Sequence, residues 1–259
     1  MQPVVSPWRF CLLLFAGMLV LIEIGRRFAV WRRAKDPLDD KSGLTTVEGA
    51  IFALFGLMIA FTFSGAASRF NEKRMLIAEE ANAIEVAYLR LELLPQDTRA
   101  PLQNLFRGYA DSRLETYRRL PDMTAAGQEM SRSKKFQEEI WTAAVVATGH
   151  KDAHAEAGIL LLPALNDMID IATTRTMALH IHPPKIVYTL LFGLGLLCSL
   201  LAGYRMSGSK HRSWLHILAF ATITVSVVYV IFDVEYPRWG LIHLETADQF
   251  LVNVRESMH

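Results

Sequence analysis

Two acidic side chains, Asp233 and Glu235, follow the last long apolar run of the sequence and precede Pro237 and Arg238 in "IFDVEYPRWGLI". Carboxylates at the end of a membrane helix either attract ions to the mouth of a pathway or pair with a neighbouring cation. An acid at the carboxyl end of a helix opposes the helix dipole, so Asp233 requires a local partner. We expect an ion pair between Asp233 and Arg238 that fixes the exit turn, with an ion-attracting vestibule as the alternative.

Four histidines are candidates for chemistry. His150 and His154 are four residues apart, a spacing that suits metal ligands on one helix face. No third ligand stands at a fixed spacing from them, so we predict no metal site and no cofactor. His180 and His182 precede two prolines at the start of an apolar run and are expected at the membrane interface. Because the sequence also lacks the common phosphate-binding, hydrolase and dinucleotide motifs, we predict that the protein is not an enzyme.

The apolar run at residues 49–67 carries a regular stripe of small residues, three or four apart. Small residues allow helix backbones to approach closely in lipid, so the stripe favours helix packing. The packing candidates are Gly49, Ala53, Gly56 and Ala60, together with Gly195, Ser199 and Gly203 at the same spacing in a later run. The alternative is a helix that lines a pore, with bulky side chains forming an apolar constriction. The pore-lining candidates are Phe52, Phe55, Ile59, Phe63 and Ser64.

Two further acids stand at the ends of apolar runs. Glu48 completes the pattern Thr45-Thr46-Val47-Glu48, in which a threonine cap and a glutamate three residues later satisfy the first amides of a helix. Glu23 precedes Arg26 and Arg27, which favours a local ion pair at the level of the lipid headgroups. We assign a structural role to both acids.

Four apolar runs position these side chains: residues 10–24, 49–67, 186–204 and 214–232. The last three have 19 residues each, which at about 1.5 Å per residue matches a hydrocarbon core of roughly 30 Å. A cleaved signal peptide is the alternative for the first run, but no small-residue cleavage pattern follows it, and Ser6-Pro7 suits a helix start. The predicted fold class is an all-α integral membrane protein with four transmembrane helices in two hairpins.

A helical extramembrane domain is predicted between the second and third spans. Apolar side chains from Ile77 to Leu91 recur at spacings of four and three, as on one face of a helix. We expect this helix to end at Pro95 and the segment "DMTAAGQEM" after Pro121 to form a loop. The predicted domains are the first hairpin (1–67), the extramembrane domain (68–184), the second hairpin (185–232) and an amphipathic C-terminal tail (233–259).

The net charge and the cysteines of the chain indicate no further class of partner besides the membrane. A net charge of +1 provides no general attraction for nucleic acid. Cys11 and Cys198 both lie in apolar runs, so neither a disulfide framework nor a metal cluster is expected. The expected partner is the lipid bilayer, and the expected location is the cell (inner) membrane as a multi-pass protein. Basic residues are nearly equal in number on the two sides of the spans and do not fix the orientation of the extramembrane domain.

Four segments of the chain resemble the bacterial bestrophin-like membrane proteins. They are "RMLIAEEANAIEVAYLRLELLP" (74–95), "LLPALNDMIDIA" (161–172), "HPPKIVYTLLFGLGLLCSLLAGY" (182–204) and "IFDVEYPRWGLI" (231–242). The resemblance covers nearly all of the chain from the second span onward. It implies kinship with bestrophins, which are pentameric anion channels whose second helix lines the pore through an apolar neck.

Carried onto this sequence, the resemblance assigns the pore helix to residues 49–67 and the neck to Phe55, Ile59 and Phe63. It implies a homo-oligomer, a pentamer by resemblance, that passes small ions, and it places the region between the second and third spans in the cytoplasm. Bestrophins also carry consecutive acids after the fourth span that clasp calcium. Here Asp233 and Glu235 are separated by Val234, so no calcium clasp is expected.

Two functions from different classes follow from the sequence. The first is a homo-oligomeric ion channel, for anions, with the second transmembrane helix lining the pore. The alternative is a membrane-anchored sensory or interaction module that acts through its helical extramembrane domain.

Overall fold

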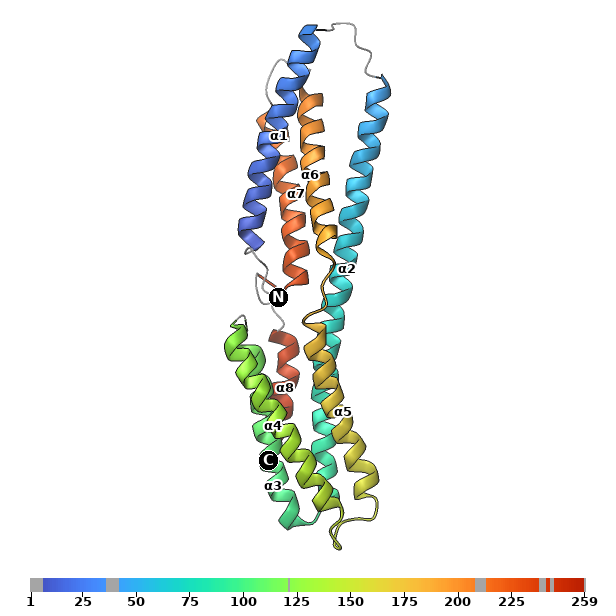
Figure 1. The fold of residues 1–259 in the computed structure, drawn as a ribbon, viewed down its shortest axis with the longest axis vertical. Coiled ribbons are helices and arrows are strands. Elements are labelled where there is room, and N and C mark those ends of the chain that lie inside the picture. Colours follow the sequence, from blue (N-terminus) through green and yellow to red (C-terminus); the bar gives the residue numbers. More distant parts are fainter. Residues whose placement is uncertain are drawn as a thin grey trace. The chain divides into compact units, whose positions relative to one another are not determined.

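The computed structural model describes residues 7–35, 42–120, 122–207, 213–237, 241–242 and 245–258 of the 259-residue chain. Every regular element within these ranges is helical, which confirms the all-α prediction (Figure 1). The elements are α1 (Pro7–Lys35), α2 (Ser42–Leu89), the short 3-10 helix η1 (Arg90–Leu93), α3 (Gln96–Arg118), α4 (Met123–Thr148), α5 (Ala157–Ala178), α6 (Lys185–Met206), α7 (Trp214–Glu235) and α8 (Glu245–Ser257).

The chain divides into two compact units. Unit 1 consists of Met1–Arg69 and His182–Gly240, and unit 2 consists of Phe70–Ile181 and Leu241–His259. The C-terminal segment Leu241–His259 belongs to unit 2. The helix α2 contributes residues to both units, because the division falls between Arg69 and Phe70.

Five helical segments in the described part of the chain are long and apolar enough to cross a membrane, one more than we predicted. Four of them contain the predicted spans, in α1, α2, α6 and α7. The fifth is α5, which we had assigned to the extramembrane domain. Its side chains Leu161, Leu165 and Met168 are fully buried in the core of unit 2, so packing within the protein accounts for its apolar character. The count of four spans is therefore not confirmed.

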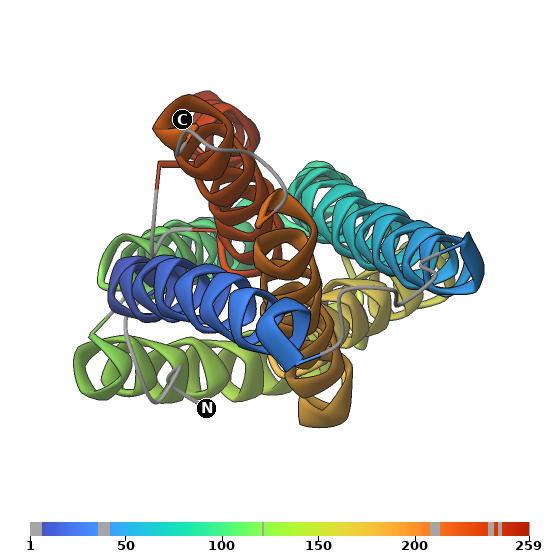
Figure 2. The same ribbon diagram turned by 90° about the horizontal axis from the view of Figure 1, so that it is seen from above.

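In unit 1, α1 lies alongside α6 and α7 (Figures 1 and 2). Glycines make the contact between α1 and α6 unusually close. A Cβ atom on Gly203 of α6 would lie 1.9 Å from the carbonyl oxygen of Ile22, and one on Gly25 of α1 would lie 2.0 Å from the carbonyl oxygen of Leu200. The two backbones therefore touch where both helices carry glycine, the mode of association that small residues allow in lipid.

The start of α2 differs from the prediction. The helix already includes Ser42, so Thr45 lies inside it and the predicted capping box is wrong. Glu48 is instead buried, and its Oε2 atom lies 3.4 Å from Nη1 of Arg205 on α6. The predicted pairing of Glu23 with Arg26 and Arg27 is confirmed, at 2.9 Å in both cases.

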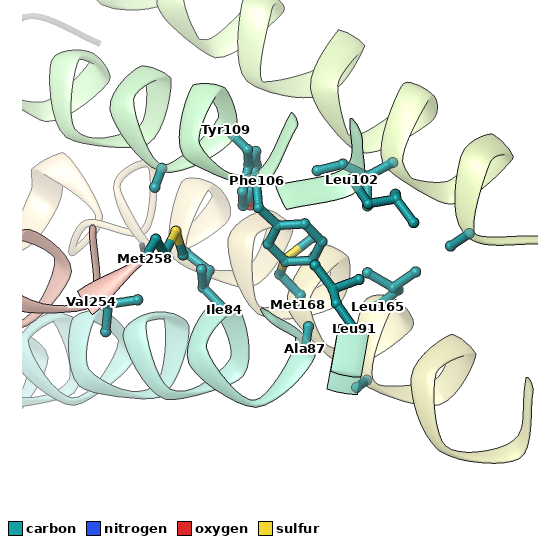
Figure 3. Packing of buried hydrophobic residues seen from close by; sticks show 14 of the residues in the cluster. Ile84, Ala87, Leu91, Leu102, Phe106, Tyr109, Leu165, Met168, Val254 and Met258 are labelled. Carbon is teal, nitrogen blue, oxygen red and sulfur yellow. The ribbon is translucent and has the colours of Figure 1, made fainter. Parts of the chain in front are cut away.

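Unit 2 is built around an apolar core to which the C-terminal part of α2, η1, α3, α4, α5 and α8 contribute (Figure 3). The predicted stripe from Ile77 to Leu91 lies in this core, and α8 adds Leu251, Val254 and Met258. The predicted loop after residue 121 is wrong. Asp122 caps α4 by accepting hydrogen bonds from the amides of Thr124 and Ala125, and the helix then runs through the segment that we expected to be irregular.

A charged network is buried beside this core. Glu80 is fully buried and accepts hydrogen bonds from Arg113 and Arg175, which are themselves 2% and 4% exposed. Arg113 donates to the hydroxyl of Tyr117 at 2.6 Å, and Arg175 lies over the ring of Tyr117 and 3.3 Å from Asp248 of α8. Burial alone would raise the pKa of Glu80, but the two guanidinium charges lower it below its ordinary value.

Candidate functional site: the faces of α2 and an ion-pair cluster

One face of α2 within unit 1 (residues 42–69) packs inside the chain. Glu48, Phe55, Thr62 and Ala66 are buried and recur at helical spacing. The Phe55 ring, only 5% exposed, lies against α6, because its Cζ atom is 3.4 Å from the position of a Cβ on Gly195. Of the neck candidates that the sequence supplies, Phe55 is thus turned towards a helix of its own chain.

A second face of α2 carries the small residues of the predicted stripe, and it is open in the chain. Gly49, Ala53, Gly56 and Ala60 are exposed. A Cβ atom placed on Gly49 or Gly56 would meet no atom of the described residues within 4 Å. The face predicted for helix packing therefore has no partner helix among the described parts of the chain.

Of the remaining pore candidates, Phe52, Ile59 and Phe63 lie between these two faces, and Ser64 lies on the small face. Phe63 and Ser64 are exposed, whereas Phe52 and Ile59 are half-buried. The ring of Phe52 makes an edge-on contact with Phe220 of α7, at 6.2 Å between centroids. A third face of α2 carries large apolar side chains that are exposed, among them Leu54, Leu57 and Phe61, of which Phe61 is 68% exposed. The helix thus presents a packed face, a small face and a bulky apolar face around its circumference.

On α6, the three small residues lie within contacts of the chain. Gly195 faces Phe55, and Gly203 faces the backbone of α1. Ser199 is fully buried, and its hydroxyl donates to the carbonyl of Gly195 at 2.8 Å. The two stripes of small residues, alike in sequence, therefore differ in the structure, because only the one on α6 is covered.

The acids at the exit of α7 are held by groups distant in sequence. Glu235 is fully buried, and its Oε2 atom accepts from Nη2 and Nε of Arg69 at 2.7 and 2.9 Å. Its Oε1 atom lies 3.0 Å from Nδ1 of His182, whose ring packs against Tyr236 at 4.5 Å between centroids. We call Arg69, His182, Glu235 and Tyr236 the exit cluster. It joins α2, the segment before α6 and the end of α7 within unit 1.

A glycine one turn before Arg69 accommodates the guanidinium. A Cβ atom on Gly65 would lie 3.3 Å from Nη1 of Arg69, a distance at which either group must shift. The sequence did not point to this arrangement, because Arg69 and Glu235 are separated by 166 residues. The one local signal was the apolar run itself, which ends two residues before Arg69.

The predicted partner of Asp233 lies outside the described residues, since Arg238 is not among them. Asp233 itself is 3% exposed, so both acids of the exit turn are buried within this chain. Pro237 follows the end of α7. His150 and His154 belong to no group of three or more metal-ligating side chains in the parts of the chain that the structure covers.

A comparison with known protein families identifies the family of this chain. The family model of the bestrophin-like domain matches residues 12–247. The chain belongs to the bestrophin-like family. This bestrophin-like chain is also similar in fold to crystal structures of a bacterial bestrophin homologue from Klebsiella pneumoniae. No curated protein matches it.

Three of these crystal structures show the extent of the likeness. One, of a mutant, has 12% sequence identity and a TM-score of 0.72, covering 98% of this chain and 99% of its own. A second mutant has 13% identity and a TM-score of 0.69, covering 95% and 98%. A third, phased with zinc, has 14% identity and a TM-score of 0.60, covering 92% and 97%. At these identities the likeness shows the fold alone, and together with the apolar helices it supports a membrane protein.

Proposed function

We propose that this bestrophin-like protein is a homo-oligomeric ion channel, for anions, in which α2 lines the pathway. In this proposal unit 1 lies in the bilayer of the cell membrane and unit 2 lies outside it. Membership of the bestrophin-like family supports the proposal. The observation in the structure that carries it is the open small-residue face of α2.

A helix face made of glycine and alanine has little to gain from lipid chains, because it offers few side-chain atoms for contact. Such faces occur where another helix approaches or where an open pathway runs along the helix. Unit 1 supplies no such helix among its described residues, so further copies of the chain are needed. Four helices per copy also enclose no wide pathway by themselves, which again requires an oligomer.

The pore-lining residues of this proposal are those that the chain leaves accessible. They are Phe63 and Ser64, with Phe52 and Ile59 partly accessible at the edge of the same face. Phe55 serves packing against α6 instead. No charged side chain occurs from Gly49 to Ala67, so the proposed constriction is apolar. Its width, and whether water fills it, then determine whether ions pass. Selectivity for anions, and a ring of five copies, rest on the resemblance to bestrophins.

Two exposed phenylalanines of α2 provide a matched test. Phe63→Ala should change anion flux through reconstituted protein, because Phe63 borders the small face. Phe61→Ala should leave flux unchanged, because Phe61 lies on the bulky apolar face. Electron microscopy of the same sample should show a cyclic oligomer with the small face of α2 near the axis. A protein that is monomeric in detergent, or that passes no ions under any ionic or pH condition, contradicts the proposal.

A membrane-anchored interaction module is the second candidate, and one observation favours it. Unit 2 exposes large apolar side chains at the end of α4 and the start of α5, among them Val146 and Ile159, which are 73% and 76% exposed. If this is the function, a double variant Val146→Ser with Ile159→Ser should abolish partner capture, while Phe63→Ala should have no effect.

A further inference from the structure

We propose that the groove between α1 and α7 binds one anionic phospholipid, with an acyl chain in the groove and the phosphate beside Arg9. The inference requires that unit 1 crosses the bilayer, but it does not require that the protein conducts ions. Both helices belong to unit 1, so the site lies within one compact part of the chain.

The groove has the size and the lining of a site for a hydrocarbon chain. Its volume is about 530 Å³, which falls within the roughly 300–1,000 Å³ of most small-molecule sites. Leu12 and Phe15 of α1 line one side, and Val225 and Val230 of α7 line the other. Cys11, which is 6% exposed, completes the wall. The groove therefore offers mainly apolar contacts, as an acyl chain requires.

The groove extends from one end of the two spans towards the middle of the bilayer. The start of α1 lies beside the end of α7, since the ring centroids of Phe10 and Phe232 are 5.1 Å apart. From that end the lining residues continue as far as Phe15 on α1 and Thr222 on α7. This stretch of each helix is about 10–12 Å long, which is most of one leaflet of a hydrocarbon core roughly 30 Å thick. The depth therefore suits a lipid chain from one leaflet, whereas a transmembrane helix would need a groove along the whole span.

The mouth of the groove carries residues that are typical of the headgroup region. Trp8 and Tyr229 line this end, and both residue types are enriched where a membrane meets water. Arg9 is exposed, and the carbon of its guanidinium lies 5.2 Å from the centroid of the Trp8 ring. A guanidinium in this place can donate two parallel hydrogen bonds to a lipid phosphate.

The charges around the mouth favour an anion. The first turn of α1 contains no acidic residue, so the positive end of its helix dipole adds to the charge of Arg9. Asp233 follows Tyr229 by one turn on α7, but it is 3% exposed and does not line the groove. A neutral helix from a second copy would gain nothing from this positive mouth. An apolar groove with a cationic mouth therefore selects an anionic amphiphile.

Native mass spectrometry of the delipidated full-length protein in detergent measures the binding. The probes are phosphatidylglycerol and phosphatidylcholine with identical chains, and glycerol phosphate without chains. Wild type should bind one phosphatidylglycerol per chain, about fivefold more tightly than phosphatidylcholine, because one arginine next to an anionic headgroup contributes roughly this factor. Glycerol phosphate should not bind. Equal affinity for the two lipids, or equal affinity for glycerol phosphate and phosphatidylglycerol, overturns the proposal.

Two cations on α1 provide a matched pair for the headgroup. Arg9→Gln should remove the preference for phosphatidylglycerol. Lys35→Gln is the control, because Lys35 lies in the same way over a tryptophan, 4.1 Å from the ring centroid of Trp31, at the other end of the helix and away from the groove. It should keep the wild-type preference. A preference that survives Arg9→Gln, or that Lys35→Gln also removes, contradicts the assignment of the phosphate to Arg9.

Two positions on α7 provide a matched pair for the chain. Ser226→Phe places a ring in the groove and should weaken binding of both lipids by about tenfold. Ile223→Phe adds the same ring on a surface that is 65% exposed and outside the groove, and it should have no effect. Circular dichroism checks the fold, and Ser226→Leu is the smaller replacement should the phenylalanine variant fail to fold.

Two outcomes for the Ser226 variants decide who occupies the groove. Unchanged lipid binding overturns the lipid site, and an altered oligomer in size-exclusion chromatography would then assign the groove to a second copy of the chain. None of these measurements uses ion flux. A protein that binds lipid as stated and passes no ions therefore supports the lipid site and contradicts the channel.

Discussion

Replacing Glu80 by glutamine should strongly destabilise unit 2, because two buried arginines share this single carboxylate. Glu80 is fully buried, and Arg113 and Arg175 are 2% and 4% exposed. Removing one partner of a buried ion pair costs about 3–5 kcal/mol, since the remaining charge is left uncompensated. In a unit of this size such a loss lowers the melting temperature by roughly 10–20 °C.

The assay is thermal unfolding of the purified protein in detergent, followed by circular dichroism at the helix band. Glu79→Gln is the matched control, because Glu79 is the adjacent residue and is exposed. It should shift the midpoint by no more than about 2 °C, as substitutions of exposed residues usually do. A triple replacement, Glu80→Leu with Arg113→Met and Arg175→Met, should recover much of the loss, because the three most deeply buried charges are removed together and the carboxylate that loses a partner, Asp248, is 21% exposed.

The dependence on pH provides a second readout. The arginines lower the pKa of Glu80 in the folded protein below its ordinary value of 4.5, so the folded state binds this proton less tightly than the unfolded state does. The resulting stabilisation is present above pH 4.5 and is lost as the pH falls through the lower folded pKa. Wild type should thus lose stability in that acidic window more steeply than Glu80→Gln. A Glu80→Gln midpoint within about 3 °C of wild type would refute the reasoning.

Three further predictions test other contacts. Gly203→Ala should prevent stable packing of α1 on α6, because its Cβ would collide with the backbone of Ile22. Gly193→Ala on the same helix should be neutral, because a Cβ there meets no described atom within 4 Å. Thermal unfolding in detergent should therefore show a lower midpoint for Gly203→Ala than for Gly193→Ala. Leu251→Ala should destabilise unit 2 by about 2–5 kcal/mol, because Leu251 is buried in its core. Arg255→Gln on the same helix should cost at most about 1 kcal/mol, because its ion pair with Asp111 is exposed. Equal losses of unfolding free energy in a denaturant titration would contradict this. Gly56→Leu should leave helix content and the oligomer in size-exclusion chromatography unchanged but lower ion flux, because its side chain would extend from the small face into the proposed pathway. Unchanged flux would count against a pathway along the small face.

Local patterns predicted the helices well where apolar spacing was continuous. The run at residues 214–232 became α7, and the stripe from Ile77 to Leu91 became part of a core. Composition does not decide the role of α5, because an apolar stretch of this length suits both a span and a buried helix. The capping pattern at Thr45 was overridden because the helix began earlier. The start of α4 was missed, although Asp122 is a typical helix cap followed by good helix formers.

The candidate site depended on pairings that no local pattern contains. Helical spacing placed the phenylalanines and the small residues of α2 on adjacent faces, but it did not show which face turns inward. That choice follows from Gly195 and Arg205 on α6, which receive Phe55 and Glu48. In the same way, the partner of Glu235 is an arginine 166 residues earlier in the chain. Such contacts are set by tertiary packing, so a single sequence predicts the participating elements and not their pairing.

The backbone contact between α1 and α6 also imposes an order on biosynthesis. Arg33 of α1 bonds to Ser207 at the end of α6, 174 residues later. At about 5–20 residues per second, the ribosome needs roughly 10–35 s to make that intervening chain. During this interval α1 resides in the membrane without its partner, its glycine-lined surface open to other helices, while most of unit 2 has already been synthesised. The contact between α1 and α6 therefore forms only after this interval, and unit 1 is completed later still, once α7 has been synthesised.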